Sequence, residues 1–538
     1  MSTFSSVGVP RIIHQTWHSS IDTVTKEKGD PYSWIENNPQ WEYKFWSDDA
    51  LRNFIKNEFP ELIEIYDSYP NAVQRADLAR YCLLSHYGGI YADIDTTCIA
   101  SLEPIAGDTR VILCEEPVAH AEPALLRGLT RLLFNGTMAS PPEHPLWKEL
   151  IRLCILMASN SHRDVLESTG PLLLSAAVEH WQEPQSISIN SSHLFCPYNN
   201  TGNTDQTSPF GAYGHKRISV HHWQGSWFNK KQNSLWSRKI GRLRQLKYNL
   251  LKGLTYKAKN SRSKINRDLL NKPLLISEAP PQVAIFIPVK DGAEFITKNF
   301  ALIQGLNYPK NRLRVIFGEG HSVDESSQII ENICRKYGSD FKQVVQLKIT
   351  SGHNISRNKR WKPSVQRQRR GAIAQVRNEM LNRALQAEDD FVLWLDVDIN
   401  HFSSEILNRL LSENEKVVVP NCVLDKGQAS FDQNCFLEIG TPSRAEYYKH
   451  CQYGLFQPPA NYWFRRHLHE LRYLDRVPLH GVGGCILLVH ADIHRAGITF
   501  PELPYKDLIE TEAFGYLARE MGIKPIGLPG VEVFHVKS

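Results

Sequence analysis

Five consecutive apolar residues, 391–395 (FVLWL), lead directly into Asp396-Val397-Asp398. A short apolar run of this length predicts a strand that is buried on both faces. Side chains alternate along a strand, so two carboxylates one position apart face the same way. Carboxylate oxygens held at a strand end suit a divalent cation that also binds phosphate oxygens. An Asp-x-Asp pair alone is a weak signal, so the surrounding residues decide its interpretation.

A second copy of this pattern occurs far upstream. A glycine turn at 88–89 precedes a short strand pattern at 90–92 (IYA), and Asp93 and Asp95 follow it. A chain of 538 residues also exceeds the size of a single hydrophobic core. We therefore expect two α/β domains, 1–229 and 281–538, joined by a helical segment at 230–280.

Strand patterns recur in the C-terminal half, at 283–289 and 313–317. Their alternation with helical spacing predicts a parallel sheet, and nucleotides bind such sheets at the carboxyl ends of the strands. The turn after 283–289 lacks the Gly-x-Gly-x-x-Gly of dinucleotide-binding proteins. In the N-terminal half, apolar spacing predicts a helix over 60–87, ahead of the first Asp-x-Asp pair.

Composition is that of a globular protein, with 42% hydrophobic and 22% charged residues. No apolar run approaches the roughly 18 to 20 residues of a membrane span, and the first residues lack the charged and apolar regions of a signal peptide. The ten cysteines form no Cys-x-x-Cys pair, which disfavours zinc and disulfide frameworks. We expect a cytoplasmic protein, with peripheral contact to the inner face of the membrane as an option.

Residues 230–272 are strongly basic, with fourteen Lys or Arg residues against the single acid Asp268. Apolar residues recur there at three-to-four-residue steps, which predicts a basic amphipathic helix. Such a helix often lies on an anionic membrane surface. An interdomain helix with solvated charges is an equally good interpretation. No aromatic-interleaved basic patch accompanies the run, so we expect no nucleic-acid binding.

The C-terminal carboxylates are surrounded by residues suited to binding a nucleotide sugar. Arginines neutralise a diphosphate, glycines let backbone approach a sugar, and a late histidine can complete a metal shell. The candidates are Pro288, Lys290, Arg367, Arg370, Arg377, Asn378 and Asp432 for the donor, Glu510 and Glu512 with Asp396 and Asp398 as catalytic acids, and His535 with the two aspartates for the metal.

These residues stand within an ordered series of motifs. The series is 366–371 (QRQRRG), 395–399 (LDVDI), 419–421 (VPN), 481–484 (GVGG), 491–495 (ADIHR), 508–512 (LIETE), 527–529 (GLP) and 534–535 (FH). In this order it resembles the fungal mannan-polymerase mannosyltransferases, glycosyltransferase family 62. The resemblance implies a GT-A fold, a retaining manganese-dependent or magnesium-dependent transferase and GDP-mannose as donor. It also implies Asp396, Asp398 and His535 near the metal, with Asp432 at an acidic position of the site.

The N-terminal half carries a different series: 13–17 (IHQTW), 75–81 (RADLARY), 88–95 (GGIYADID), 169–171 (TGP) and 222–227 (HWQGSW). This series resembles glycosyltransferase family 32, which contains outer-chain-initiating mannosyltransferases and capsular sugar transferases. The resemblance implies that Asp77 and Arg80 hold the donor sugar, and that Asp93 and Asp95 act with His222 around the metal. The remaining donor-binding candidates are His14, Gln15, Trp17, Asn135, Ser226 and Trp227, and the donor is a GDP- or UDP-sugar.

Two copies of one site suggest a bifunctional glycosyltransferase that adds successive sugars to a surface glycan or lipid-linked oligosaccharide. In an alternative, one domain is catalytic and the other binds or scaffolds the growing glycan. A third hypothesis is an effector that glycosylates a protein, because toxin-type transferases share the layout of the first domain.

Overall fold

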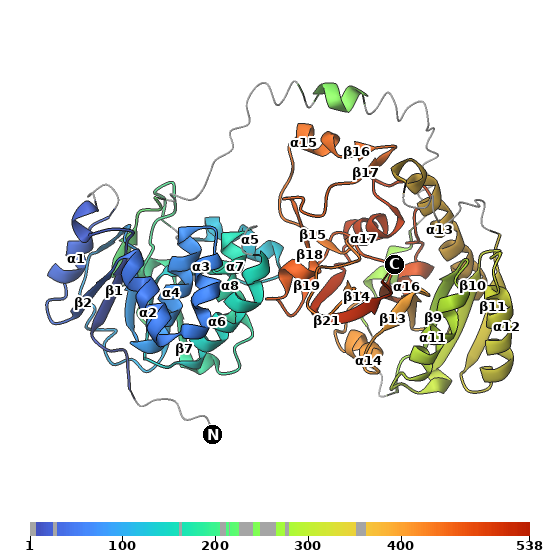
Figure 1. Ribbon diagram of the computed structural model, residues 1–538, viewed down its shortest axis with the longest axis horizontal. Coiled ribbons are helices and arrows are strands. Elements are labelled where there is room, and N and C mark those ends of the chain that lie inside the picture. The colour runs from blue at the N-terminus through green and yellow to red at the C-terminus, as the bar shows by residue number, and fades with distance from the viewer. Residues whose placement is uncertain are drawn as a thin grey trace. The chain divides into compact units, whose positions relative to one another are not determined.

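The computed structural model describes residues 7–24, 29–160, 164–204, 211–214, 216–224, 240, 242–247, 265–274, 279–350 and 362–537. The chain forms two compact units, 1–231 and 232–538, shown in Figure 1. The division between them falls inside the segment expected to join two domains. None of the described helices is both long and apolar enough to cross a bilayer.

The first unit is built on a six-stranded mixed sheet with the order β2-β1-β3-β6-β5-β7. Its strands are β1 (Ile12–Thr16), β2 (Glu42–Trp46), β3 (Gly89–Ala92), β5 (Val111–Glu115), β6 (Leu133–Ser140) and β7 (Ile187–Asn190). Every residue of β3 and β6 is buried, as expected for inner strands. A separate two-stranded ladder pairs β4 (Thr96–Cys98) with β8 (Ser219–His221).

The first unit's helices are α1 (Pro31–Glu36), α2 (Asp48–Glu58), α3 (Ile63–Ser68), α4 (Ala72–His86), α5 (Glu122–Leu126), α6 (Pro145–Met157), α7 (Val165–Ser168) and α8 (Pro171–Glu179). The single helix expected over 60–87 is interrupted, because a short 3-10 turn (Pro60–Leu62) and α3 precede α4. Pro70 lies at the break, where it cannot donate a helical hydrogen bond. Asn71 then caps α4 in a capping box with Gln74.

The second unit contains a nine-stranded mixed sheet with the order β11-β10-β9-β12-β20-β14-β21-β13, in which β19 also pairs with β21. The strands are β9 (Val283–Val289), β10 (Leu313–Glu319), β11 (Gln343–Lys348), β12 (Phe391–Leu395), β13 (Ile399–His401), β14 (Val417–Val423), β19 (Val477–Pro478), β20 (Ile486–His490) and β21 (Ile526–His535). The four strands β11, β10, β9 and β12 are parallel, and β20 is antiparallel to β12. All five residues of β12 are buried, as the apolar run predicts.

The principal helices of this unit are α11 (Ala293–Gln304), α12 (Ser326–Tyr337), α13 (Pro363–Ala384), α14 (Ile406–Leu411), α15 (Arg444–Lys449), α16 (Ala491–Arg495) and α17 (Glu510–Glu520). Short two-residue strands β16 (Cys451–Gln452) and β17 (Leu455–Phe456) form a hairpin after α15, and β15 (Phe436–Glu438) pairs with β18 (Arg465–His467). These two α/β units confirm the predicted fold class.

The basic segment is described only in part, as a helical stretch at 242–247, here called the linker helix, and as α10 (Arg267–Asn271). Leu270 of α10 is buried, and Asn266 donates its backbone N–H to the carbonyl of Ala496 at 2.9 Å. The end of the basic segment therefore packs on the second unit. This packing agrees with the interdomain-helix interpretation for that end alone.

Candidate active sites

In the first unit, Asp93 and Asp95 follow β3 directly and face a histidine from β8. The Nε2 atom of His221 lies 3.0 Å from Oδ1 of Asp95 and 4.0 Å from Oδ2 of Asp93. One ligand atom from each of the three side chains lies within 4.8 Å of the others. Two carboxylates and one imidazole form a donor set that fits Mn²⁺ or Mg²⁺.

The ladder between β4 and β8 selects His221 rather than its neighbour. His221 pairs with Thr96, the residue directly after Asp95, and so faces the carboxylates. His222 instead donates its backbone N–H to the Asp95 carbonyl, and its Nε2 lies 2.9 Å from Oγ1 of Thr97. The sequence-based assignment of His222 to the metal is therefore corrected to His221, because neighbouring side chains on a strand face opposite sides.

A buried polar network beside Asp93 is centred on Asp77 and Arg80 of α4. The Nη2 atom of Arg80 is 3.1 Å from oxygens of both Asp77 and Asp93. Asn135 donates to Asp77 at 3.1 Å, and Thr169 donates to the other oxygen of Asp77 at 2.9 Å. Three predicted donor-binding residues, Asp77, Arg80 and Asn135, are thus brought together beside Asp93.

Three further candidates from the first strand occupy supporting positions. His14 is fully buried, accepts a hydrogen bond from the Trp46 indole at 3.1 Å and bonds the carbonyl of Gly88 at 3.1 Å. Both of its ring nitrogens are thus used within the fold, so His14 does not serve as a direct donor contact. Gln15, also fully buried, donates to the Asp93 carbonyl at 3.1 Å and positions that residue.

Trp17, the residue after β1, is partly buried. Ser226 and Trp227 lie outside the described residues.

Burial and neighbouring charges set the protonation behaviour of this site. Burial raises the pKa of Asp77 to about 6, although Arg80 opposes that effect. Burial also raises the pKa of Asp93, again against Arg80. For Asp95 burial acts in the same direction, but the hydrogen bond and charge of His221 together with backbone N–H donors outweigh it, and the pKa of Asp95 is lowered. Asp95 is therefore the carboxylate that stays ionised most readily.

The second unit repeats the arrangement after β12, which, like β3, lies between one parallel and one antiparallel neighbour. The Nε2 atom of His535, at the end of β21, lies 3.1 Å from Oδ1 of Asp398. His535 pairs with Ile399, the residue directly after Asp398, and the Val536 N–H donates to the Asp398 carbonyl at 3.1 Å. The ladder after the carboxylates thus has the same register as in the first unit.

Asp396 stands slightly apart from this pair. Among the described residues, only the trio in the first unit brings three ligand atoms within 4.8 Å of one another. Nη2 of Arg377 lies 3.3 Å from Oδ1 of Asp396 and so engages one of its oxygens. Burial, together with Asp398 and Asp432, raises the pKa of Asp396 to about 7, although Arg377 opposes that shift.

One buried carboxylate oxygen joins two arginines of α13. Oε1 of Glu510, the first residue of α17, lies 3.3 Å from Nη1 of Arg370 and 3.4 Å from Nη1 of Arg377. Glu512 pairs instead with Arg465 at 3.0 Å, and both side chains are buried. Arg377 thus contacts both Glu510 and Asp396 and links the two carboxylates. Glu512 instead forms a buried ion pair with Arg465.

Asp432 is held in place by backbone amides and by two glycines that leave it room. Its Oδ2 accepts from the N–H of Gly484 at 3.0 Å, and its Oδ1 accepts from the Asn434 side chain at 2.8 Å. A Cβ atom at Gly483 would lie 1.9 Å from Oδ2 of Asp432, and one at Gly484 would lie 2.4 Å from Nη2 of Arg377. Gly483 and Gly484 of the motif at 481–484 therefore leave room for the side chains of Asp432 and Arg377.

The other predicted donor-binding residues are less closely gathered. Lys290 donates to the carbonyl of Gly320 at 2.8 Å, and Pro288 lies within β9. Asn378 exchanges hydrogen bonds with the backbone of Phe500, at 2.9 and 3.1 Å, and so anchors that loop to α13. Arg367 lines a separate pocket of the second unit. The structure does not bring Asn378 or Arg367 into the Asp396 cluster.

Sequence reasoning missed His221 and the bridging role of Glu510. The signal for His221 was present, because the strand alternation of 219–221 turns it and His222 to opposite sides. The ladder partner that fixes which side faces Asp95 is distant in sequence, so only the structure supplies it.

Comparison with known proteins supports both resemblances. Residues 267–504 match the family model Anp1, and residues 26–112 match the model described as a glycosyltransferase sugar-binding region containing a DXD motif. Inositol phosphoceramide mannosyltransferase 3 of Schizosaccharomyces pombe is 34% identical over 181 residues, which are 33% of this chain and 47% of that protein. The chain therefore spans about half the length of this relative.

Two more proteins are similar to the chain. The mannan polymerase complex subunit mnn9 of the same organism is 31% identical over 274 residues, or 47% of this chain and 80% of that protein. A solved mannosyltransferase from Pyrobaculum calidifontis, in complex with GDP-Man and Mn²⁺, is 15% identical with a TM-score of 0.29, covering 56% of this chain and 68% of that one.

Proposed function

Because the chain belongs to the Anp1 family and also carries a glycosyltransferase DXD region, we propose that it is a mannosyltransferase with two metal-dependent transfer sites. The observation that carries the proposal is the repeated arrangement of two carboxylates and a register-matched histidine. GDP-mannose is the proposed donor of the second unit, and a GDP- or UDP-sugar that of the first. The acceptor is a surface glycan or a lipid-linked oligosaccharide, and the two units add successive sugars to it.

In each unit the chain's own residues divide the work between metal and donor. Asp93, Asp95 and His221 would hold the cation in the first unit, and Asp398 with His535 and Asp396 in the second. A bound cation supplies a Lewis acid for the leaving diphosphate.

The remaining polar residues of each site serve the donor. In the first unit, Asp77, Arg80 and Asn135 orient the donor sugar through the buried network that they form. In the second, Arg370 and Arg377 place positive charge beside the acids, where a diphosphate would gain most from it.

Paired double substitutions test whether both units transfer sugar. Asp93→Ala/Asp95→Ala and Asp396→Ala/Asp398→Ala each remove one carboxylate pair and leave the other unit as an internal control. We expect each variant to lose one donor-hydrolysis and transfer activity, measured with a panel of nucleotide sugars. If one double substitution leaves all chemistry intact and only weakens acceptor binding, the bifunctional proposal is wrong.

A specific observation favours a second candidate function. Arg377 already engages Asp396, and the three ligands of the second unit are less tightly gathered than those of the first. In this alternative the second unit binds or scaffolds the growing glycan while the first transfers sugar. The same pair of variants distinguishes the two functions.

A further inference from the structure

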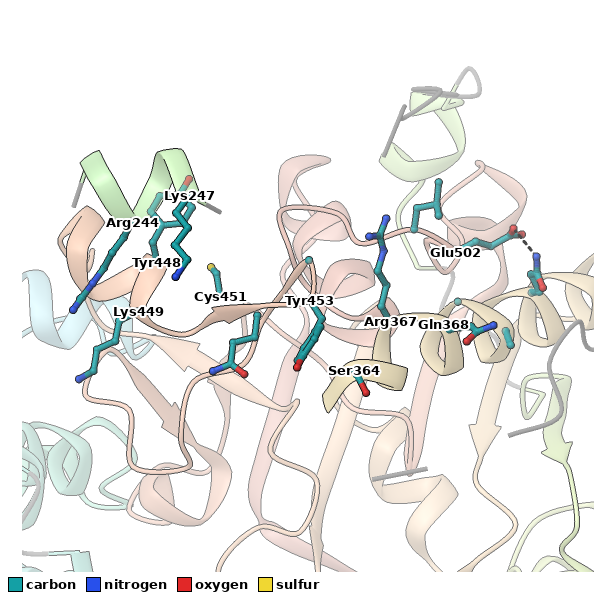
Figure 2. A pocket seen from close by; sticks show the side chains of 16 residues that line it. Arg244, Lys247, Ser364, Arg367, Gln368, Tyr448, Lys449, Cys451, Tyr453 and Glu502 are labelled. Carbon is teal, nitrogen blue, oxygen red and sulfur yellow. Dashed lines mark hydrogen bonds between the residues drawn. The ribbon is translucent and has the colours of Figure 1, made fainter. Parts of the chain in front are cut away.

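The second unit contains a pocket of about 1020 Å³, and neither Asp396 nor Asp398 lines it. It lies between the linker helix, one face of α13 and the segment 448–454 around the β16–β17 hairpin, as Figure 2 shows. Ser364, Gln368, Gly371 and Gln375 contribute the α13 face at three-to-four-residue steps. At about 100° per residue, this stripe points away from Arg370 and Arg377 on the same helix, whereas Arg367, which also lines the pocket, lies one turn before Arg370. The volume is at the upper end of that of small-molecule sites.

The charges of the pocket are unevenly arranged. Its lining has four cationic side chains and one carboxylate, Glu502. Arg244, Lys247 and Lys449 gather around Tyr448 at one end, whereas Glu502 lies at the other end (Figure 2). Glu502 is also held by amides of α13, with Gln375 donating to it at 3.4 Å. One end of the pocket is therefore strongly cationic and suited to a phosphate group.

The linker helix supplies two of these three cations and is itself fixed to the unit. Nη1 of Arg244 donates to the Ala445 carbonyl of α15 at 3.0 Å, which, among the residues that the structure describes, leaves the other guanidinium donors for a ligand. The same helix exposes two large apolar side chains, Leu243 at 67% and Leu246 at 65%. Cations beside exposed leucines match the boundary between lipid phosphates and acyl chains.

We propose that this pocket binds the phosphate of a lipid headgroup, with Leu243 and Leu246 entering the adjoining acyl region. The cationic end, formed by Arg244, Lys247 and Lys449, holds the phosphate. The polar α13 stripe and the exposed ring of Tyr453 face the part of the headgroup beyond the phosphate. We take this lipid to be the acceptor, and that part of the inference rests on the proposed function. Binding of the lipid itself does not depend on the proposed function.

Vesicle sedimentation with the full chain tests the pocket. The probes are phosphatidylcholine vesicles with and without phosphatidic acid, and soluble glycerol phosphate as competitor. Each Lys or Arg near an anionic surface contributes about 1 kcal/mol, so Arg244→Gln/Lys247→Gln/Lys449→Gln should weaken binding to phosphatidic acid vesicles on the order of a hundredfold. A control variant, Lys336→Gln/Lys426→Gln/Lys524→Gln, removes equal charge from exposed positions of the same unit and should bind like the wild type.

A second variant separates a lipid from a free phosphate. Leu243→Ser/Leu246→Ser should weaken vesicle binding several-fold but leave glycerol phosphate binding unchanged. Glycerol phosphate binding without vesicle binding would assign the pocket to a free phosphate and overturn the lipid assignment. Equal losses in the pocket and control triple variants would overturn the pocket altogether, because diffuse surface charge would then explain the binding.

The transferase reaction is scored separately in the same samples. Metal-dependent hydrolysis of GDP-mannose should persist in the pocket triple variant, because its three residues lie outside the carboxylate clusters. Vesicle binding without any hydrolysis by the wild type would refute the proposed function and leave the lipid site standing. Hydrolysis without vesicle binding would refute the lipid site alone.

Discussion

Replacement of His221 by alanine should remove the metal site of the first unit, whereas replacement of His222 should not. The two residues are neighbours, but only the His221 imidazole lies with Asp95 and Asp93, at 3.0 and 4.0 Å. The His222 ring lies 2.9 Å from the Thr97 hydroxyl instead. Each variant therefore removes one imidazole, and the two imidazoles lie on opposite sides of the same strand end.

The expected magnitude follows from the place of His221 in the ligand set. It contributes one of three clustered ligand atoms. Loss of even an outer-shell partner of a metal ligand costs about 10–100-fold in metal affinity. Loss of a direct ligand should therefore cost on the order of a hundredfold or more, against less than about threefold for His222→Ala.

Calorimetric titration with Mn²⁺ alone measures this difference directly. Both variants are made in an Asp396→Ala/Asp398→Ala background, so that the second unit contributes no binding. Thermal unfolding without metal shows whether either substitution acts by disturbing the fold. Equal affinities for the two variants, or a larger loss with His222→Ala, would refute the assignment made from the ladder register.

Two predictions concern the second unit. Gly483→Ala should abolish its donor hydrolysis and leave the first unit active, because the added Cβ would lie 1.9 Å from Oδ2 of Asp432; normal activity would show that the glycine is dispensable. Acidification should destabilise the unit through His494, whose pKa burial lowers to about 4 from 6.5. The unfolded chain then binds the proton first, so stability is complete above about pH 6.5 and falls by about 2 kcal/mol at pH 5. Urea unfolding of wild type and His494→Gln tests this, since the variant should lack that loss.

The sheet architecture was predictable where apolar runs were continuous. The five residues before Asp396 form a buried inner strand, because a short continuous apolar run places hydrophobic side chains on both faces of the sheet. The prediction of one helix over 60–87 was only partly right, because the spacing of apolar residues does not predict the break at Pro70. A local sequence pattern therefore predicts the existence of an element more reliably than it predicts the residues at which the element begins and ends.

The site was predictable as a set of residue types, but not as a set of contacts. Asp77, Asp93 and Asp95 were identified from their motifs, and the structure brings Asp77 and Asp93 together at Arg80 and Asp95 to His221. The bridge from Glu510 to Arg370 and Arg377 joins residues more than 130 positions apart. Such contacts depend on how α13 and α17 pack, which no local pattern records.

The matched ladders after the two Asp-x-Asp pairs have a consequence for how such chains can vary over evolution. His221 opposes Thr96, and His535 opposes Ile399, so in both units the histidine faces its carboxylate through strand register alone. A single inserted or deleted residue in β8 or β21 would turn the imidazole to the opposite side while every motif residue survived. Length changes in these two strands should therefore be tolerated less than many substitutions, and homologues can keep an intact motif yet lose the site.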